Sequence, residues 1–136
     1  MLKKILSISG KPGLFKLISH GKNMIIVESF IDKKRIPSYS YDKVVSLGDI
    51  AIFTEDEEVP LIEVFDKIKM KENGEVASID PKANSTLLQA YFAEVLHDFD
   101  RERVFPSDIK KIITWYNLLI NNGISDFKEE ESEIEA

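Results

Sequence analysis

The chain has 136 residues and a net charge of −6, and 43% of its residues are hydrophobic, with eight Phe, four Tyr and one Trp. This length allows one ordinary domain or two very small ones with a real core. Cysteine is absent, which excludes disulfides, thiolate nucleophiles and thiolate metal sites and fits a reducing compartment. Apolar runs are too short for a membrane span, and the stretch after Lys3 and Lys4 is too short for a signal peptide. We therefore expect a soluble cytoplasmic protein without a membrane partner.

The charges divide unevenly along the chain. Residues 1–48 hold nine Lys or Arg and three acidic residues, a net charge of +6, whereas residues 49–136 hold nine and 21, a net charge of −12. Such an asymmetry indicates an interaction surface without naming its partner. Residues 124–136 are predicted to form an acidic, flexible tail, which we expect to compete with anionic partners for the basic half.

Short apolar runs in the first half predict β-strands joined by tight turns. A connection at residues 20–23 contains Gly21, which can take a positive φ, and this indicates a hairpin. Pro37 is typical of an edge strand or a bulge. The expected strands are residues 14–19, 24–31, 36–39 and 49–54, with 43–47 ambiguous. Four or five such strands within about 50 residues predict a small curled barrel of the SH3-like kind.

The second half changes to helical periodicity. A helix is expected to start near Pro60, and two more are expected after the caps Ser85 and Ser107. Residues 74–84 contain Gly74 and Pro81 and are typical of a linker. The predicted core of this half consists of Leu88, Phe92, Val95, Ile112, Ile113 and Tyr116.

The stretch Gly10-Lys11-Pro12-Gly13 has to be weighed as a phosphate-binding loop. The phosphate-loop pattern has four residues between its glycines and continues into a helix. Here two residues separate the glycines, Pro12 lacks an amide N–H, and a strand follows. A turn is therefore the favoured interpretation, with Lys11 kept as a cation on a functional edge.

The two histidines do not form an evident catalytic or metal motif. His20 falls in the predicted hairpin turn, and His97 precedes Asp98 and Asp100 near a helix end. A metal site needs several convergent ligands, and no second cluster supplies them. We expect no metal and no cofactor, and no catalytic residue is assigned.

The basic run Lys33-Lys34-Arg35, followed by Tyr39 and Tyr41, is the better functional candidate. Cations beside exposed aromatic rings can attract phosphates and stack on bases. The alternative is an ordinary charged turn with both tyrosines packed on the barrel. The acidic second half disfavours RNA, because it repels phosphate.

Several stretches resemble an uncharacterised bacterial family of conserved hypothetical proteins that carry domains of unknown function. The resemblance extends over roughly residues 2–122, and its stretches are ISGKPGLFKLIS, VESF, KVVSLGDIAIFT, EVPLIEVFDKI and SDIKKIITWYNLL. It implies a small N-terminal β module followed by a helical part, and it implies no catalytic residues.

These observations together predict an α+β fold. We expect an SH3-like β-barrel over residues 1–58, a helical region over 59–123 and the acidic tail over 124–136. The expected function is that of a non-enzymatic adaptor that binds a protein partner through the basic β module, at Lys11, Lys33, Lys34, Arg35, Tyr39 and Tyr41. The alternative is an RNA- or ribosome-associated module, and an enzyme such as a hydrolase or transferase ranks third.

Overall fold

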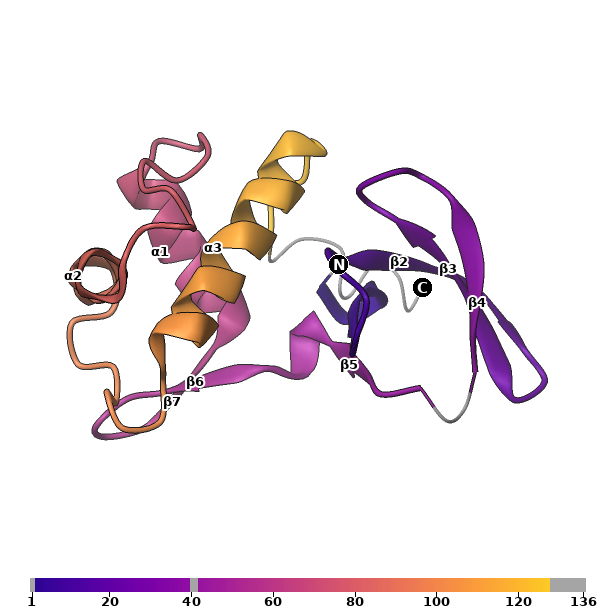
Figure 1. Ribbon diagram of the computed structural model, residues 1–136, viewed down its shortest axis with the longest axis horizontal. Helices are drawn as coiled ribbons and strands as arrows, with labels where there is room; N and C mark the ends of the chain where they lie inside the picture. Colours follow the sequence, from indigo (N-terminus) through magenta and orange to yellow (C-terminus); the bar gives the residue numbers. More distant parts are fainter. Residues whose placement is uncertain (1, 40–41, 128–136) are drawn as a thin grey trace. The chain divides into compact units, whose positions relative to one another are not determined.

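The computed structural model describes residues 2–39 and 42–127, which form two compact units (Figure 1). The first unit runs to Ile50 and takes in the chain again from Asp126, and the second is Ala51–Ser125. The first unit is built on strands and the second on helices, so the α+β class is confirmed. The division falls at residue 50, whereas the sequence places the end of the β module at residue 58.

The first unit contains a five-stranded antiparallel sheet in the order β4-β3-β2-β1-β5. Four strands follow one another as a meander, and the fifth returns to pair with β1. A register shift between Leu17 and Ser19 marks a bulge in β2, which increases local twist. The elements of this unit are η1 (Leu2–Lys4), β1 (Ile5–Ile8), β2 (Phe15–Gly21), β3 (Met24–Ser29), β4 (Arg35–Tyr39), β5 (Val44–Ser46) and η2 (Leu47–Asp49).

Strand β1 is a central strand that the sequence pattern did not indicate. It pairs with β2 on one side and with β5 on the other. Leu6 and Ile8 lie in the core of the unit with Phe15 and Val27. Only four residues long, β1 shows too little alternation to be distinguished from the start of a loop.

The sheet is open in the part of the chain that the structure describes. Strands β4 and β5 are its two edges, and no closed barrel is seen among residues 2–39 and 42–50. The segment expected to complete the barrel, residues 49–54, does not join the sheet. Its strand β6 (Ala51–Phe53) pairs with β7 (Glu58–Pro60) in the second unit instead.

The second unit consists of the β6–β7 hairpin and three helices, α1 (Leu61–Lys71), α2 (Ser85–Val95) and α3 (Pro106–Asn121). Asn84, and not Ser85, caps α2, because its Oδ1 accepts from the Leu87 amide. Helix α3 begins at Pro106, with the Asp108 carboxylate accepting from the Phe105 N–H. The predicted core is confirmed, since all six of its residues are buried: Leu88, Phe92, Val95, Ile112, Ile113 and Tyr116.

The segment expected to be a linker, residues 74–84, is fixed to the helices of the second unit. The Ala77 N–H donates to Asn117 Oδ1 at 2.8 Å, and the Tyr116 hydroxyl donates to the Glu75 carbonyl at 2.6 Å. The Ser78 N–H donates to Glu72 Oε2 at 2.9 Å. The segment connects α1 and α2 without helix or strand, as expected of a linker, but it is not free, because polar side chains of α3 and Glu72 satisfy its backbone.

The chain returns to the first unit after α3. Phe127 belongs to the first unit and has no exposed surface, so the expectation of a solvated tail is wrong at this residue. The remainder of the predicted tail, residues 128–136, lies outside the described residues. In the described part of the chain, every helix falls short of the length and apolarity that crossing a membrane requires.

Candidate interaction surfaces

The turn between β3 and β4 carries the basic run of the sequence. Ser29 Oγ accepts from the Ile31 N–H at 3.0 Å, and the Ser29 N–H donates to the Lys34 carbonyl at 2.9 Å. Asp32 Oδ1 accepts from the Lys34 N–H at 3.0 Å. These bonds hold Lys33 at a φ of 63°, a conformation that a long side chain seldom adopts. The basic residues therefore stand on a well-defined turn.

Lys11 comes from the loop between β1 and β2, which lies at the same end of the sheet. The start of β2 pairs with the end of β3 through Phe15 and Ser29. The Phe30 N–H then donates to the Leu14 carbonyl at 3.0 Å, which joins the two loops. The structure thus brings Lys11, Lys33, Lys34 and Arg35 to one end of the sheet, and we call these four residues the basic loop end.

Tyr39 lies at the opposite end of β4. Arg35 pairs with Glu28 across the strands, and its Nε donates to Glu28 Oε1 at 3.0 Å. Arg35 and Tyr39 are four residues apart on one strand, so they share a face and are separated by about 13 Å. Tyr39 is 43% exposed. Tyr41, the other predicted aromatic residue, lies outside the described residues.

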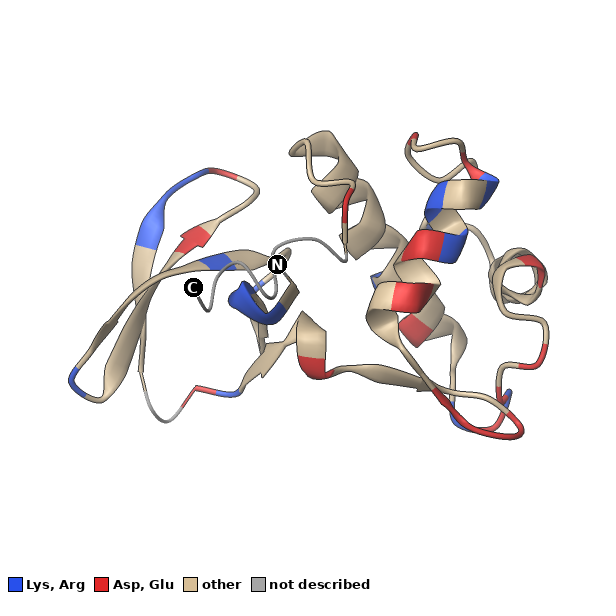
Figure 2. Ribbon diagram, turned by 180° about the vertical axis from the view of Figure 1, so that it is seen from behind, with Lys and Arg blue, Asp and Glu red and all other residues tan. Residues whose placement is uncertain are grey.

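Residues 1–50 carry an excess of positive charge, whereas acidic residues are concentrated on the second unit (Figure 2). Residues 1–50 carry nine Lys or Arg against four Asp or Glu, and the nine are all exposed. Arg35 is paired with Glu28. Seven further lysines of residues 1–50 take part in no ion pair among the described residues. They are Lys3, Lys4, Lys11, Lys16, Lys22, Lys34 and Lys43.

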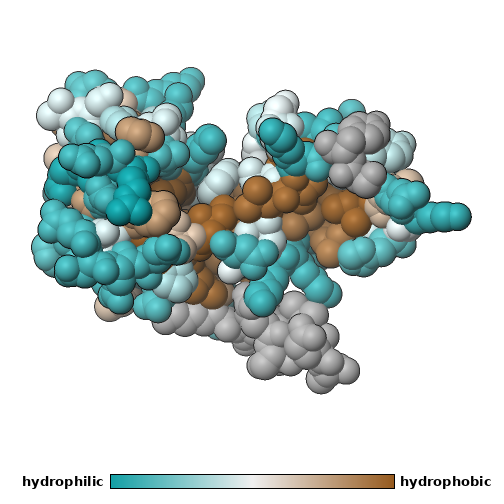
Figure 3. All heavy atoms as spheres, turned by 90° about the horizontal axis from the view of Figure 1, so that it is seen from below, coloured by the Kyte–Doolittle hydropathy of each residue, from teal (hydrophilic) through white to brown (hydrophobic). Residues whose placement is uncertain are grey.

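A pocket of about 320 Å³ opens at the Tyr39 end of the sheet. Ile25 and Val44 lie in it, and both are partly buried side chains packed against the core of the unit. Figure 3 shows hydrophobic surface on this unit between hydrophilic side chains. The lining residues, which we call the Tyr39 pocket, are Gly21, Asn23, Met24, Ile25, Ser38, Tyr39, Asp42 and Val44.

The edge strand β4 is protected against pairing with another strand. Pro37 lies in its middle and has no N–H to offer. At the next outward-facing position, the Tyr39 N–H donates to Asp42 Oδ2 at 2.8 Å, and the Tyr39 carbonyl accepts from the Asp42 N–H at 2.9 Å. Strand addition at this edge is therefore disfavoured, and side chains are left as the means of recognition.

The second unit has an acidic cleft of about 370 Å³ that contains His97. Glu57, Glu58, Glu63 and Asp98 line it with Lys67. Asp100, from the weighed His-Asp motif, is engaged elsewhere, because its carboxylate accepts from Arg103 Nε at 3.0 Å and from the Glu102 N–H at 2.9 Å. His20 lies on β2 in the other unit. Within residues 2–39 and 42–127, no three His, Asp or Glu side chains are grouped to hold a metal ion.

Shifted pKa values occur in a polar cluster of the second unit around Glu72. Burial raises the pKa of Tyr91 far above its ordinary value of 10, and its hydrogen bond to Glu72 adds to this. Burial, followed by the charges of Glu72 and Glu75, raises the pKa of Tyr116 to about 12. For Glu72, burial favours a higher pKa, but hydrogen bonds from Ser78 and Tyr91 outweigh it and lower the pKa below 4.5. All of these groups hold the 72–84 loop, which makes the cluster structural.

Comparison with known proteins places the chain in a family. A model described as a domain of unknown function (DUF6852) matches residues 50–119, and a second, also described as a domain of unknown function (DUF5606), matches residues 2–47. The chain belongs to the DUF6852 family. The two matches meet where the structure divides into its two units, and the expected membership of an uncharacterised bacterial family is confirmed.

The chain is also similar to a solved structure. A protein from Bacteroides vulgatus, determined by solution NMR, is 63% identical over 93% of this chain and 91% of that chain, with a TM-score of 0.78. No curated protein matches the chain.

The Tyr39 pocket was missed by sequence reasoning. Its residues come from the β2–β3 hairpin, the end of β4 and the start of β5, and no local pattern indicates that these three segments meet. The one available signal was Tyr39, which the sequence analysis named as a candidate, and a single residue does not reveal a cavity.

Proposed function

We propose that the first unit is a non-enzymatic binding module for a protein partner with an acidic surface. The observation that carries this proposal is the concentration of exposed cations in residues 1–50 of this unit, nine against four acids. Cations that are not paired with acids attract an oppositely charged surface, speed up the encounter and select against basic partners. Charge recognition of this kind needs no catalytic group.

A protein is favoured over RNA as the partner. The second unit carries 14 acidic residues against eight basic ones. This charge repels RNA more than a protein partner, because RNA carries a negative charge at every nucleotide whereas an acidic protein surface is local. Binding of single-stranded RNA also relies on successive aromatic rings. In the described part of the first unit, Tyr39 is the one exposed large aromatic residue, and it lies about 13 Å from Arg35.

RNA binding is the second candidate, because Lys11 and Lys34 would attract phosphates as well as carboxylates. We also propose that the sheet is SH3-like. A fifth strand that returns to β1 and a bulge in β2 are features that support a small curled barrel. The cysteine-free sequence suits a cytoplasmic module.

A pull-down with the immobilised full chain tests the proposal. We expect the immobilised chain to capture a protein that is still retained after the lysate has been treated with nuclease. The double variant Lys11→Glu, Lys34→Glu should reduce capture by about tenfold or more, because both charges reverse at the basic loop end. Its matched control is Lys110→Glu, Lys111→Glu, two exposed residues of α3.

The outcomes separate the candidates. Capture that disappears with nuclease would favour the RNA-associated module. Capture that the control variant reduces as strongly as the Lys11 and Lys34 variant would place the binding surface on the helical unit and contradict the proposal.

A further inference from the structure

The Tyr39 pocket leaves the core of the first unit incompletely covered. Four buried residues form that core, and four further hydrophobic side chains pack on it while partly exposed. Two of these four, Ile25 and Val44, line the pocket, beside the half-buried Met24 and the exposed Tyr39. An aliphatic side chain inserted here would remove their remaining apolar surface from water, which is favourable.

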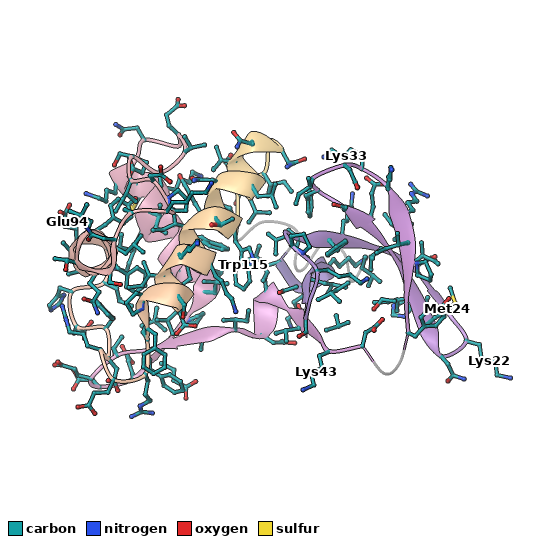
Figure 4. All side chains as sticks on the ribbon, in the orientation of Figure 1. Lys22, Met24, Lys33, Lys43, Glu94 and Trp115 are labelled. Carbon is teal, nitrogen blue, oxygen red and sulfur yellow. The ribbon has the colours of Figure 1, made fainter. Side chains whose placement is uncertain are left out.

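Two lysines adjoin lining residues of the pocket in the sequence. Lys22 lies between the lining residues Gly21 and Asn23, and Lys43 lies between Asp42 and Val44. Figure 4 shows Lys22 beside Met24 at the hairpin tip and Lys43 on the segment that enters β5, with both side chains pointing outward. Among the described residues, neither lysine has an ion-pair partner.

The acidic group at this site is already engaged. Asp42 Oδ2 accepts from the Ser38 hydroxyl at 3.0 Å and from the Tyr39 N–H at 2.8 Å. These two donors hold the carboxylate against β4, so the lysines remain the outward-facing charges. The pocket therefore suits a short acidic segment that carries one aliphatic side chain.

The chain contains a segment of this chemistry. Residues 128–136 have the sequence KEEESEIEA, in which Ile134 is the sole large apolar residue and lies between Glu133 and Glu135. This segment begins next to Phe127, which is buried in the first unit. Seven residues of extended chain span up to about 24 Å, roughly the width of a 60-residue unit.

We propose that the Tyr39 pocket binds the chain's own C-terminal segment in the same molecule, with Ile134 in the pocket and Glu133 and Glu135 near Lys22 and Lys43. Attachment through Phe127 gives this segment a local concentration in the millimolar range, so weak contacts suffice to populate the bound state. The consequence for partners rests on the proposed function. A docked segment lies against the core-facing side chains Ile25 and Val44, and its Glu side chains compete electrostatically with an acidic partner for the cations of this unit.

Methyl NMR of the full-length protein tests this contact without any partner. With Ile δ1 and Met ε methyl groups labelled, we expect NOE cross-peaks from Ile134 to the Met24 methyl group or the Tyr39 ring at low salt. Ile134→Ser should shift the Met24 methyl signal, whereas the Met70 methyl, 80% exposed on α1, should not move. Ile31→Ser, at the opposite end of the sheet and 58% exposed, is the matched control and should leave Met24 unchanged.

Charge dependence supplies the second arm. Lys22→Glu with Lys43→Glu should abolish the cross-peaks, and 1 M salt should weaken them because the screening length falls to about 3 Å. Lys110→Glu with Lys111→Glu should preserve them. The proposal is overturned if Ile134 shows no cross-peak to the pocket and Ile134→Ser leaves Met24 unmoved, or if isotope-mixed samples show the contact only between two copies. Neither result bears on the pull-down, so the two proposals fail independently.

Discussion

Ser29 determines the geometry of the basic loop end. Its hydroxyl accepts from the Ile31 N–H and, at 3.5 Å, from the Asp32 N–H, and its side chain is 9% exposed. The turn that follows forces Lys33 to a positive φ. A Ser side chain that replaces a missing backbone partner in this way is a local alternative to sheet bonding.

Removing this hydroxyl should loosen the turn. Ser29→Ala leaves two backbone donors without their acceptor, and we expect a loss of about 1 kcal/mol in the free energy of unfolding. Urea unfolding measures the loss, and faster hydrogen exchange at the Ile31 amide locates it. Ser19→Ala, an exposed serine of β2, is the control. Equal midpoints for the two variants would show that the turn does not depend on Ser29.

Glu72 should make the stability of the helical unit depend on acid pH. Its pKa in the folded chain lies below 4.5 because Ser78 and Tyr91 donate to it against the effect of burial. A carboxylate whose pKa is lower in the folded than in the unfolded chain stabilises the fold at pH values above its unfolded pKa. This stability is lost as the pH falls through the folded pKa. Glu72→Gln should therefore lower the urea midpoint at pH 7, and the difference should narrow by pH 3.

The fluorescence of Trp115, the single Trp and a half-buried residue of α3, reports the unfolding of this unit. Glu63→Gln, an exposed residue of α1, is the control and should leave the pH profile unchanged. A difference between Glu72→Gln and the natural chain that stays constant from pH 7 to pH 3 would contradict the role of the Glu72 charge.

Helices α2 and α3 form the most predictable part of the fold. Phe92 has no exposed surface and contacts Phe99 edge to face, with ring centroids 5.0 Å apart. The ring centroids of Phe65 on α1 and Tyr116 on α3 lie 6.4 Å apart. Such helices can be predicted because their apolar residues recur every 3.6 residues along the sequence, whatever the helix packs against.

Truncation of Phe92 tests the packing of α2. Phe92→Ala removes a fully buried ring and should cost about 3–5 kcal/mol through lost burial and a cavity. Phe105→Ala, at the start of α3 and 54% exposed, should cost far less. Thermal or urea unfolding of both variants decides the matter, and comparable losses would mean that the burial of α2 is misassigned.

Strands were less predictable than helices, for a physical reason. The strands β2, β3 and β4 have apolar runs and turns that the sequence shows locally. In contrast, the sequence of residues 51–53 predicts a strand but not its sheet, because the choice of sheet depends on partners that are distant in the chain. The positive φ of the hairpin likewise falls on Asn23 at 60° and not on Gly21. The basic run and Lys11 could both be named from the sequence, whereas their position at one end of the sheet and the Tyr39 pocket could be seen only in the fold.

The whole molecule combines a basic segment, residues 1–50 of the sheet unit, with an acidic helical unit, and residues 126–136 return to the sheet unit with six acidic residues and one Lys. Residues 1–50 carry nine basic and four acidic residues, and residues 51–125 carry eight and 14. The burial of Phe127 also changes how the C-terminal segment should be studied. A truncation at Asp126 removes a core side chain of the first unit, so truncations have to begin at residue 128 to test the charges alone.

Carbodiimide crosslinking of the captured, nuclease-treated complex tests the central claim most directly, because this reagent joins lysine amines to carboxylates that touch them. Mass spectrometry of the crosslinked peptides identifies both partners. The account predicts that Lys11 or Lys34 is joined to an Asp or Glu of the partner protein. Crosslinks confined to lysines of the helical unit, such as Lys110 and Lys111, would contradict it.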